Sequence, residues 1–187
     1  MKKWIFISLA FTACNNKIEH PIALISPYVE VVNTDTSLHN ANGTWMKDGA
    51  KFSGFIVVKE KDILVGKLPI INGKENGVAY EWYKNGKRKF ERNFLNGNRE
   101  GNHKGWYPND TLSFIQFFKD DKLEGEQFGF YESGHRFQVL KYVNGYEVGR
   151  QKTWNDSGRV VNNFTVKNGK LYGIIGRYDC MSVMSKK

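Results

Sequence analysis

The C-terminal tail contains the residues best suited to metal chemistry. Cys180, Met181 and Met184 place one thiol beside two thioethers, and soft sulfur ligands of this kind select Cu(I). The same side chains also suit an apolar tail that packs on the preceding fold, because Met and free Cys are common core residues. We favour packing, and we keep a Cu(I)-handling accessory protein as an alternative function.

The other residue types that could do chemistry form no recognisable site. The sequence has no nucleophile-elbow serine motif and no glycine loop that would bind phosphate between a strand and a helix. Cys14 and Cys180 lie near opposite ends of the chain, without the close Cys or His neighbours of a zinc site. The histidines, which show no ligand spacing to one another, are His20, His39, His103 and His135. We therefore expect a protein that is not an enzyme and that binds no cofactor.

The first fourteen residues have the pattern of a secretory signal. A basic start is followed by an apolar stretch from Trp4 to Phe11 and by two small residues directly before Cys14. This stretch is too short to span a membrane, which requires about 20 residues. Small residues followed by Cys resemble the lipobox of bacterial lipoproteins, and the resemblance implies that residues 1–13 are removed and Cys14 is acylated. An ordinary secretory signal with an incidental cysteine is the alternative.

Acylation would anchor the protein to a membrane of the bacterial cell envelope, on the periplasmic or the surface side. Two or more acyl chains hold a protein on a membrane durably. A basic, aromatic sheet could also bind nucleic acid, but an exported protein does not meet it. We therefore expect the membrane as one partner, and a protein or an acidic ligand of the envelope as another.

The composition indicates a folded, positively charged domain. The 187 residues include 28 Lys and Arg against 19 Asp and Glu, which gives a formal charge of +9, and 40% of them are hydrophobic. Such a chain can bury a core, which excludes a disordered tail protein. We divide it into a signal peptide (1–13), a lipid-anchored tether and N-terminal cap (14–46), a repeat region (47–175) and a C-terminal tail (176–187).

A repeat of 24 residues runs through most of the chain. Turn-forming pairs recur at this spacing and are Asn72-Gly73, Asn96-Gly97, Asp120-Asp121, Asn144-Gly145 and Asn168-Gly169. A column of single glycines consists of Gly77, Gly101, Gly125, Gly149 and Gly173, and an aromatic column of Trp82, Trp106, Phe130 and Trp154. Lys47-Asp48-Gly49 lies one period before the first turn pair. Three columns in phase indicate a tandem array of one supersecondary unit.

Each unit contains two strand-like runs, for example Val78 to Tyr83 and Lys87 to Leu95, separated by turn residues. A three-residue loop at 84–86 predicts that Trp82 lies opposite Arg88 and Tyr80 opposite Phe90, which brings aromatic side chains together. Such a loop ends in a residue with left-handed backbone conformation. The column at that position, which suits this conformation, is Gly86, Asp110, Gly134 and Gly158.

One such hairpin cannot bury its apolar side chains alone, so neighbouring hairpins must stack. We expect an all-β fold, an elongated and twisted antiparallel array of β-hairpin repeats in a single sheet. The unit Asn-Gly, three residues, Gly, four residues, Trp-Tyr-x-Asn-Gly is similar to the MORN repeat and its bacterial variant, a family labelled as antitoxins; residues 72–97 match it best. The resemblance implies a single-sheet solenoid used for binding or scaffolding, with no catalytic residues.

Two surfaces of the array could bind a ligand. Tyr83, Tyr107 and Tyr131 alternate with the Trp82 column, so we expect them on the other face of the sheet. With Lys87, Arg88 and Lys89 on a neighbouring turn, they could contact an acidic ligand or a protein. The plainer interpretation is a charged face that keeps the sheet soluble.

The Trp82 column itself could stack against sugars. It shares its alternation with Phe94, Phe118 and Tyr142, so we expect it to be buried in the repeat core. The function predicted is a non-catalytic binding or scaffold module of the cell envelope. An immunity or antitoxin protein is a further alternative, although a secretion signal separates the chain from a cytosolic toxin.

Overall fold

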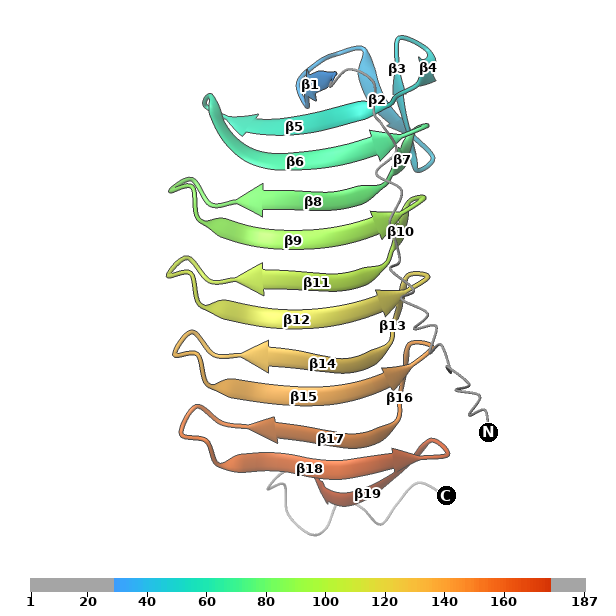
Figure 1. Ribbon diagram of the computed structural model, residues 1–187. Helices are drawn as coiled ribbons and strands as arrows, with labels where there is room; N and C mark the ends of the chain where they lie inside the picture. The colour runs from blue at the N-terminus through green and yellow to red at the C-terminus, as the bar shows by residue number, and fades with distance from the viewer. Residues whose placement is uncertain (1–28, 176–187) are drawn as a thin grey trace, which may run out of the picture.

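The computed structural model describes residues 29–175, which form an all-β fold (Figure 1). Sixteen strands belong to one long sheet and three to a small second sheet. The long sheet is antiparallel except where β1 pairs with β5, and its strand order does not close into a barrel. No helix in this part of the chain is long and apolar enough to cross a membrane. The predicted fold class, a single sheet of repeated β-hairpins, is confirmed.

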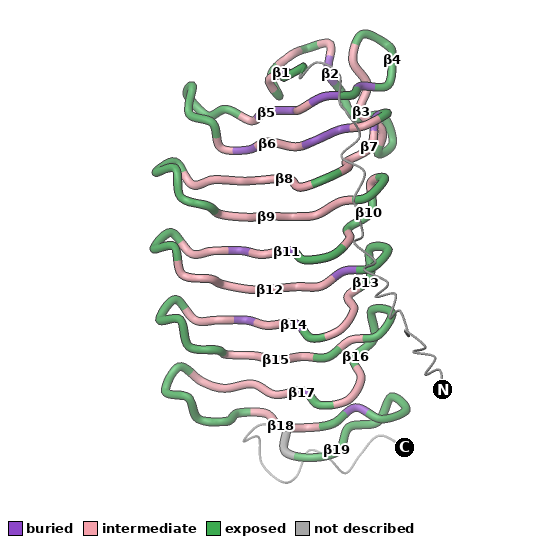
Figure 2. The backbone as a smooth tube through the Cα atoms, in the orientation of Figure 1, coloured by how far each residue is buried: buried purple, intermediate pink, exposed green. Residues whose placement is uncertain are grey.

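The N-terminal strands enclose the main apolar core. The long sheet begins with β1 (Glu30–Val32), β5 (Gly54–Glu60) and β6 (Ile63–Ile71), and the small sheet consists of β2 (Leu38–Ala41), β3 (Thr44–Lys47) and β4 (Ala50–Lys51). The core side chains are Val31, Leu38, Phe52, Ile56 and Ile70. Figure 2 shows these buried positions gathered at this end. Strand β1 forms the first edge of the long sheet, and β3 runs across the predicted boundary between residues 46 and 47. The tether predicted from residue 14 begins outside the described residues, and the capping role stays a prediction.

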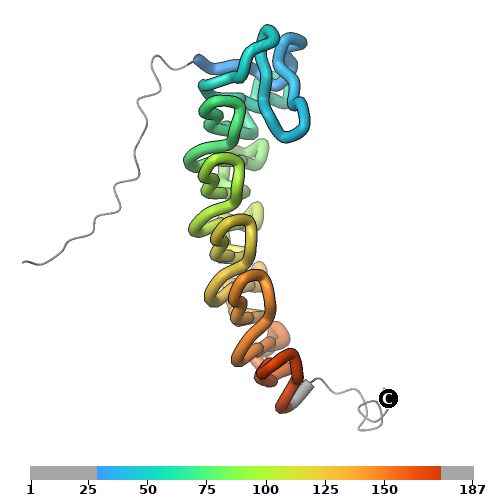
Figure 3. The backbone as a smooth tube through the Cα atoms, turned by 90° about the vertical axis from the view of Figure 1, so that its right-hand side faces the viewer, coloured from blue at the N-terminus to red at the C-terminus, as the bar shows by residue number. Residues whose placement is uncertain are grey.

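Each 24-residue unit contributes two long strands and one short strand. The first long strands are β8 (Gly77–Trp82), β11 (Gly101–Trp106), β14 (Gly125–Phe130) and β17 (Gly149–Trp154). The second are β9 (Arg88–Leu95), β12 (Leu112–Lys119), β15 (Arg136–Val143) and β18 (Val160–Lys167). The short strands are β7 (Lys74–Glu75), β10 (Asn98–Arg99), β13 (Lys122–Leu123) and β16 (Tyr146–Glu147), and the sheet ends with β19 (Lys170–Ile175). The units stack into one elongated array that twists gradually (Figure 3).

The loop between β8 and β9 has the predicted three residues. The Tyr83 N–H donates to the Lys87 carbonyl at 2.8 Å, and the Gly86 N–H donates to the Tyr83 carbonyl at 2.8 Å. Gly86 has a φ of +79°, which a residue without Cβ adopts at little cost. Trp82 lies opposite Arg88, so this part of the predicted register is confirmed.

A β-bulge follows immediately and changes the rest of the register. The pairing shifts by one residue between Glu81 and Trp82, because β9 has an extra residue at Lys89. Phe90 therefore lies opposite Glu81, and the predicted pairing of Tyr80 with Phe90 is wrong. The same shift occurs in each of the three following repeats.

The bulge also exchanges the faces on which the aromatic columns lie. Phe94 pairs with Gly77 and so lies on the same face as Ala79 and Glu81. Trp82 lies on the other face, with Tyr80. The Trp82 column therefore lies on the face opposite Phe94, and the predicted shared core of these columns is wrong. We call the face of Trp82 and Tyr80 the ring face. We call the face of Ala79, Glu81 and Phe94 the groove face.

The turn at Asn72 and Gly73 has positive φ at both residues, 50° and 79°, as a two-residue hairpin turn requires.

Beyond this turn the neighbouring strands of consecutive repeats separate. Strands β6 and β8 align only at Gly66 with Glu81 and at Lys67 with Tyr80. Later repeats are likewise joined by two aligned residue pairs. Other contacts must therefore hold neighbouring repeats together.

Candidate functional site

The three predicted tyrosines join consecutive repeats. The Tyr83 hydroxyl donates to the Trp106 carbonyl at 2.8 Å, Tyr107 to the Phe130 carbonyl at 2.8 Å, and Tyr131 to the Trp154 carbonyl at 2.9 Å. Burial raises the pKa of the Tyr83 phenol, so this hydroxyl remains a donor at neutral pH. Each hydroxyl is thus engaged within the array, and contact of these rings with a partner stays a prediction.

The three predicted cations do not form one cluster with the tyrosines. The Lys89 ammonium lies 6.0 Å from the centre of the Tyr83 ring, on the groove face. The Arg88 guanidinium lies over the Trp106 ring at 5.0 Å, on the ring face. Lys87 is exposed in the loop. The structure brings Tyr83 and Lys89 together and places Arg88 on the opposite side of the sheet.

The ring face carries one large aromatic side chain per repeat beside basic groups. The rings of Trp82, Trp106, Phe130 and Trp154 are all partly exposed. The Tyr80 and Trp82 rings stack with centres 5.9 Å apart. Arg136 lies 5.9 Å from the centre of the Phe130 ring, and Lys152 lies 4.7 Å from that of Trp154. This arrangement of flat rings and cations can bind planar apolar surfaces together with negative charge.

A hollow of about 400 Å³ opens on this face beside the last tryptophan. Arg136 and Trp154 form two of its walls, and the loop residues Asp156 to Gly158 form another. Here an aromatic ring and a cation border space that a ligand group could occupy.

Sequence reasoning missed a buried polar column on the groove face, which we call the polar ladder. Its members, at equivalent repeat positions, are His103, Gln127 and Gln151, with exposures of 3%, 3% and 0%. The Gln127 Oε1 accepts from the Phe117 N–H at 2.8 Å, and its Nε2 donates to the Glu124 carbonyl at 2.9 Å. Each member thus binds the backbone of the preceding repeat where the strands diverge. Two glutamines at one column, in the interior of strands, were the available sequence signal.

His103 is the first member of the polar ladder. Its Nε2 lies 2.8 Å from the Asn93 carbonyl, and its ring packs between Phe94 and Phe118 at centre distances of 5.6 and 4.7 Å. Burial lowers the pKa of His103, while the hydrogen bond to Asn93 acts in the opposite direction. The ring is therefore a neutral structural group at neutral pH.

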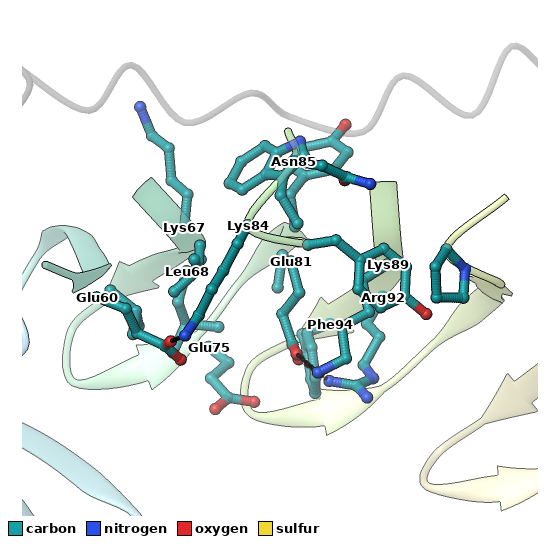
Figure 4. Close-up of a pocket in the computed structure, with 18 residues that line it drawn as sticks. Glu60, Lys67, Leu68, Glu75, Glu81, Lys84, Asn85, Lys89, Arg92 and Phe94 are labelled. Atoms are coloured by element: carbon teal, nitrogen blue, oxygen red, sulfur yellow. Dashed lines mark hydrogen bonds and ion pairs between the residues drawn. The ribbon is translucent and has the colours of Figure 1, made fainter. Parts of the chain in front are cut away.

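The corresponding residue of the first repeat is Ala79. It lines a groove of about 830 Å³ where β6 and β8 diverge, and residues of both faces of the sheet contribute to this groove, including Tyr80 and Trp82 of the ring face (Figure 4). Charged side chains line this groove. Lys84 pairs with Glu60 at 2.9 Å, and Glu81 pairs with Arg92. The Glu75 carboxylate also faces the groove, without a hydrogen bond or ion pair to another residue in the range 29–175.

The remaining predicted sites fall outside the described residues. These are the lipidation residue Cys14 and the sulfur ligands Cys180, Met181 and Met184. Within residues 29–175, no group of three or more His, Cys, Asp and Glu side chains is arranged to hold a metal ion.

The chain was compared with protein-family models and with curated proteins, and neither comparison finds a match. The fold and its contacts thus define a β-hairpin repeat protein with a unit of 24 residues, stabilised between repeats by the tyrosines and the polar ladder.

Proposed function

We propose that the chain is a lipid-anchored protein of the bacterial cell envelope whose MORN-like array is a non-catalytic binding module. Its contact surface is the ring face, and its ligand is acidic. The observation that supports this most directly is the column of one partly exposed ring per repeat, with cations at 4.7 to 5.9 Å from three of the rings.

The charges of the ring face favour an anionic ligand. Within the repeats β8 to β18, the strand register assigns to this face nine basic residues, Arg88, Lys104, Lys119, Lys122, Arg136, Lys141, Arg150, Lys152 and Lys167. Within the repeats β8 to β18, its acidic residues by the same register are Glu91 and Glu126. An excess of positive charge beside flat rings suits an acidic glycan, since the rings stack on sugar faces and the cations pair with carboxylates.

The predicted export signal supports an envelope location, where acidic glycans occur on the same side of the membrane as the mature protein. The repeat spacing and the single open sheet support the MORN resemblance and a scaffold-like shape. The alternatives, an antitoxin or immunity protein and a Cu(I)-handling protein, rest on the family label and on Cys180, Met181 and Met184 respectively.

The experiment is a calorimetric titration with polygalacturonate as the acidic probe and dextran as the neutral one. We expect the chain bearing Cys14→Ser to bind polygalacturonate and not dextran. The double variant Arg136→Glu, Lys152→Glu should bind at least about tenfold more weakly, because two side chains that attract the carboxylates of polygalacturonate would then repel them. The control variant Lys51→Glu, Lys61→Glu changes charge equally at exposed positions outside the repeats, in the small sheet and in the turn between β5 and β6. Equal losses in both variants would contradict a specific ring-face site.

A further inference from the structure

The groove beside Ala79 lies where the polar ladder is interrupted. In the later repeats a Gln or His side chain fills the gap between diverging strands and donates to backbone carbonyls. Ala79 has no polar side-chain group, so the first repeat lacks a member of the polar ladder. The backbone at this position is alike in all repeats, since β6 and β8 diverge as the later strands do, and only the residue type differs.

The backbone opposite Ala79 offers acceptors and no donor. The position that supplies the N–H to Gln127 and Gln151 is Phe117 and Lys141 in the later repeats, and it is Pro69 in the first. Proline has no N–H. The Pro69 carbonyl accepts from the Asn76 N–H at 3.0 Å and receives no side-chain donor from residues 29–175. In the later repeats the same carbonyl accepts a second bond, from the ladder side chain.

A carboxylate adds to this acceptor character. Glu75 is half-buried at the groove and has no ion pair among residues 29–175. Burial raises its pKa, as expected for a carboxylate that lacks a nearby partner. The basic residues that line the groove on this face are already paired. Arg92 and Lys89 pair with Glu81, and Lys84 pairs with Glu60. Figure 4 shows Glu75, Glu81 and Arg92 on one side of the strands and Lys67 on the other.

The rest of the groove can hold an alkyl chain. Val58, Leu68, Ala79 and Phe94 contribute apolar surface, and Gly66 adds no side chain. Apolar walls with a few placed polar groups are typical of small-ligand sites.

We propose that the part of this groove on the groove face, around Glu75 and Ala79, is a second binding site for an alkyl chain that ends in a guanidinium or ammonium group. The cationic head takes the place of the absent rung, donating to Glu75 and to the Pro69 carbonyl, while the stem packs on Leu68 and Ala79. The head can belong to a free alkylamine or alkylguanidine, or to an Arg or Lys side chain of a peptide.

The test is an NMR titration of the full chain bearing Cys14→Ser, following the Ala79 and Leu68 methyl signals. The probes are n-butylguanidinium, its neutral analogue n-butylurea, and pentanoate. We expect butylguanidinium to shift these signals with a dissociation constant in about the millimolar range. Butylurea should bind more weakly and pentanoate should not bind. Equal shifts with butylurea, or no shift with butylguanidinium, would overturn the proposal.

Two variants connect the binding to the groove. Glu75→Gln should weaken butylguanidinium binding at least about tenfold, because a bond to a charged group is lost. Glu147→Gln makes the same change at the equivalent position three repeats later and should leave binding unaltered. Ala79→Gln rebuilds the rung and should abolish binding while keeping the fold. Unchanged binding in both Glu75→Gln and Ala79→Gln would contradict the site.

The source of the cationic group is distinguished by one further probe, the capped tripeptide Gly-Arg-Gly. Binding about tenfold tighter than that of butylguanidinium would identify a protein segment as the natural ligand. Equal binding would identify the side-chain group alone as what the site recognises. Glu75→Gln and Ala79→Gln change residues of the groove face, so they should leave polygalacturonate binding unaltered, which keeps the two proposals distinguishable.

Discussion

The Gln151 side chain binds the backbone of Lys141 as a neighbouring strand would. Its Oε1 accepts from the Lys141 N–H at 3.0 Å, and its Nε2 donates to the Lys141 carbonyl at 3.0 Å. An open sheet with so few aligned pairs between repeats would leave backbone groups unpaired where the strands diverge. The polar ladder satisfies them, and it therefore decides how the repeats stay together.

Removal of a rung should destabilise the array strongly. In Gln127→Ala the Phe117 N–H loses its partner in a buried setting, and a cavity remains. We expect a loss of about 2–4 kcal/mol in the free energy of unfolding, measured by urea denaturation. The neighbouring exposed residue provides the control, since Glu126→Ala should change the free energy by less than about 0.5 kcal/mol. A similarly small effect for both variants would show that the polar ladder does not stabilise the array.

The tyrosine hydrogen bonds between repeats should contribute less to the free energy of unfolding than the polar ladder does. Tyr107→Phe removes only the hydroxyl that donates to the Phe130 carbonyl. We expect this change to cost about 0.5–1.5 kcal/mol in the free energy of unfolding. The Tyr146 side chain is 77% exposed, so Tyr146→Phe serves as a matched control without effect. Equal stabilities for Tyr107→Phe and the parent chain would show that this bond contributes nothing net.

The bulge makes Gly129 sterically necessary. A Cβ at this position would lie 2.5 Å from the Phe137 ring, which is the extra residue of the bulge in β15. Gly129→Ala should therefore lower the free energy of unfolding by about 1–3 kcal/mol. The double variant Gly129→Ala, Phe137→Ala should lose less than the sum of the two single changes, because the clash is then absent. Strict additivity in this double-mutant cycle would contradict the proposed packing.

Stability should fall in mild acid because of His103. Burial lowers its pKa below the ordinary value of 6.5, so the unfolded chain takes up the proton more readily than the folded one. The contribution of the neutral ring is present above about pH 6.5 and is lost as the pH falls through the lower folded pKa. Urea denaturation at pH 5 and pH 7 should show lower stability at pH 5, and His103→Gln should reduce the difference. In contrast, His135→Gln, at an exposed position, should retain it. A pH dependence that is the same in His103→Gln as in the parent chain would contradict this assignment.

The sequence predicts the period and the turns well, and the faces poorly. The Asn-Gly spacing and the glycine at position 86 report local backbone conformations, which depend on nearby residues and can be read from residue type. The bulge at Lys89 has no such signature, because neither Gly nor Pro marks it. One extra residue reverses the alternation of side chains along the strand, so the shared face predicted for the Trp82 and Phe94 columns was wrong.

The candidate sites show the same limit. The alternation of Tyr83 with Trp82 separates their faces correctly, but only the coordinates show that the Tyr83 hydroxyl reaches the next repeat. The pair of Ala79 and Pro69, which defines the groove, lies in one repeat and departs from the pattern of the others. Such a departure becomes meaningful only when the ladder contacts of the other repeats are known.

The central claim is that an acidic chain binds along the ring face, across several repeats. The most direct measurement is the affinity of oligogalacturonates of increasing length for the chain bearing Cys14→Ser. We expect affinity to rise with length, because each added repeat engages another ring and cation. In the variant Trp82→Ala, Trp106→Ala, Trp154→Ala, checked for folding by circular dichroism, this rise should disappear. Affinity that does not depend on length, or a rise that persists in the variant, would contradict the claim.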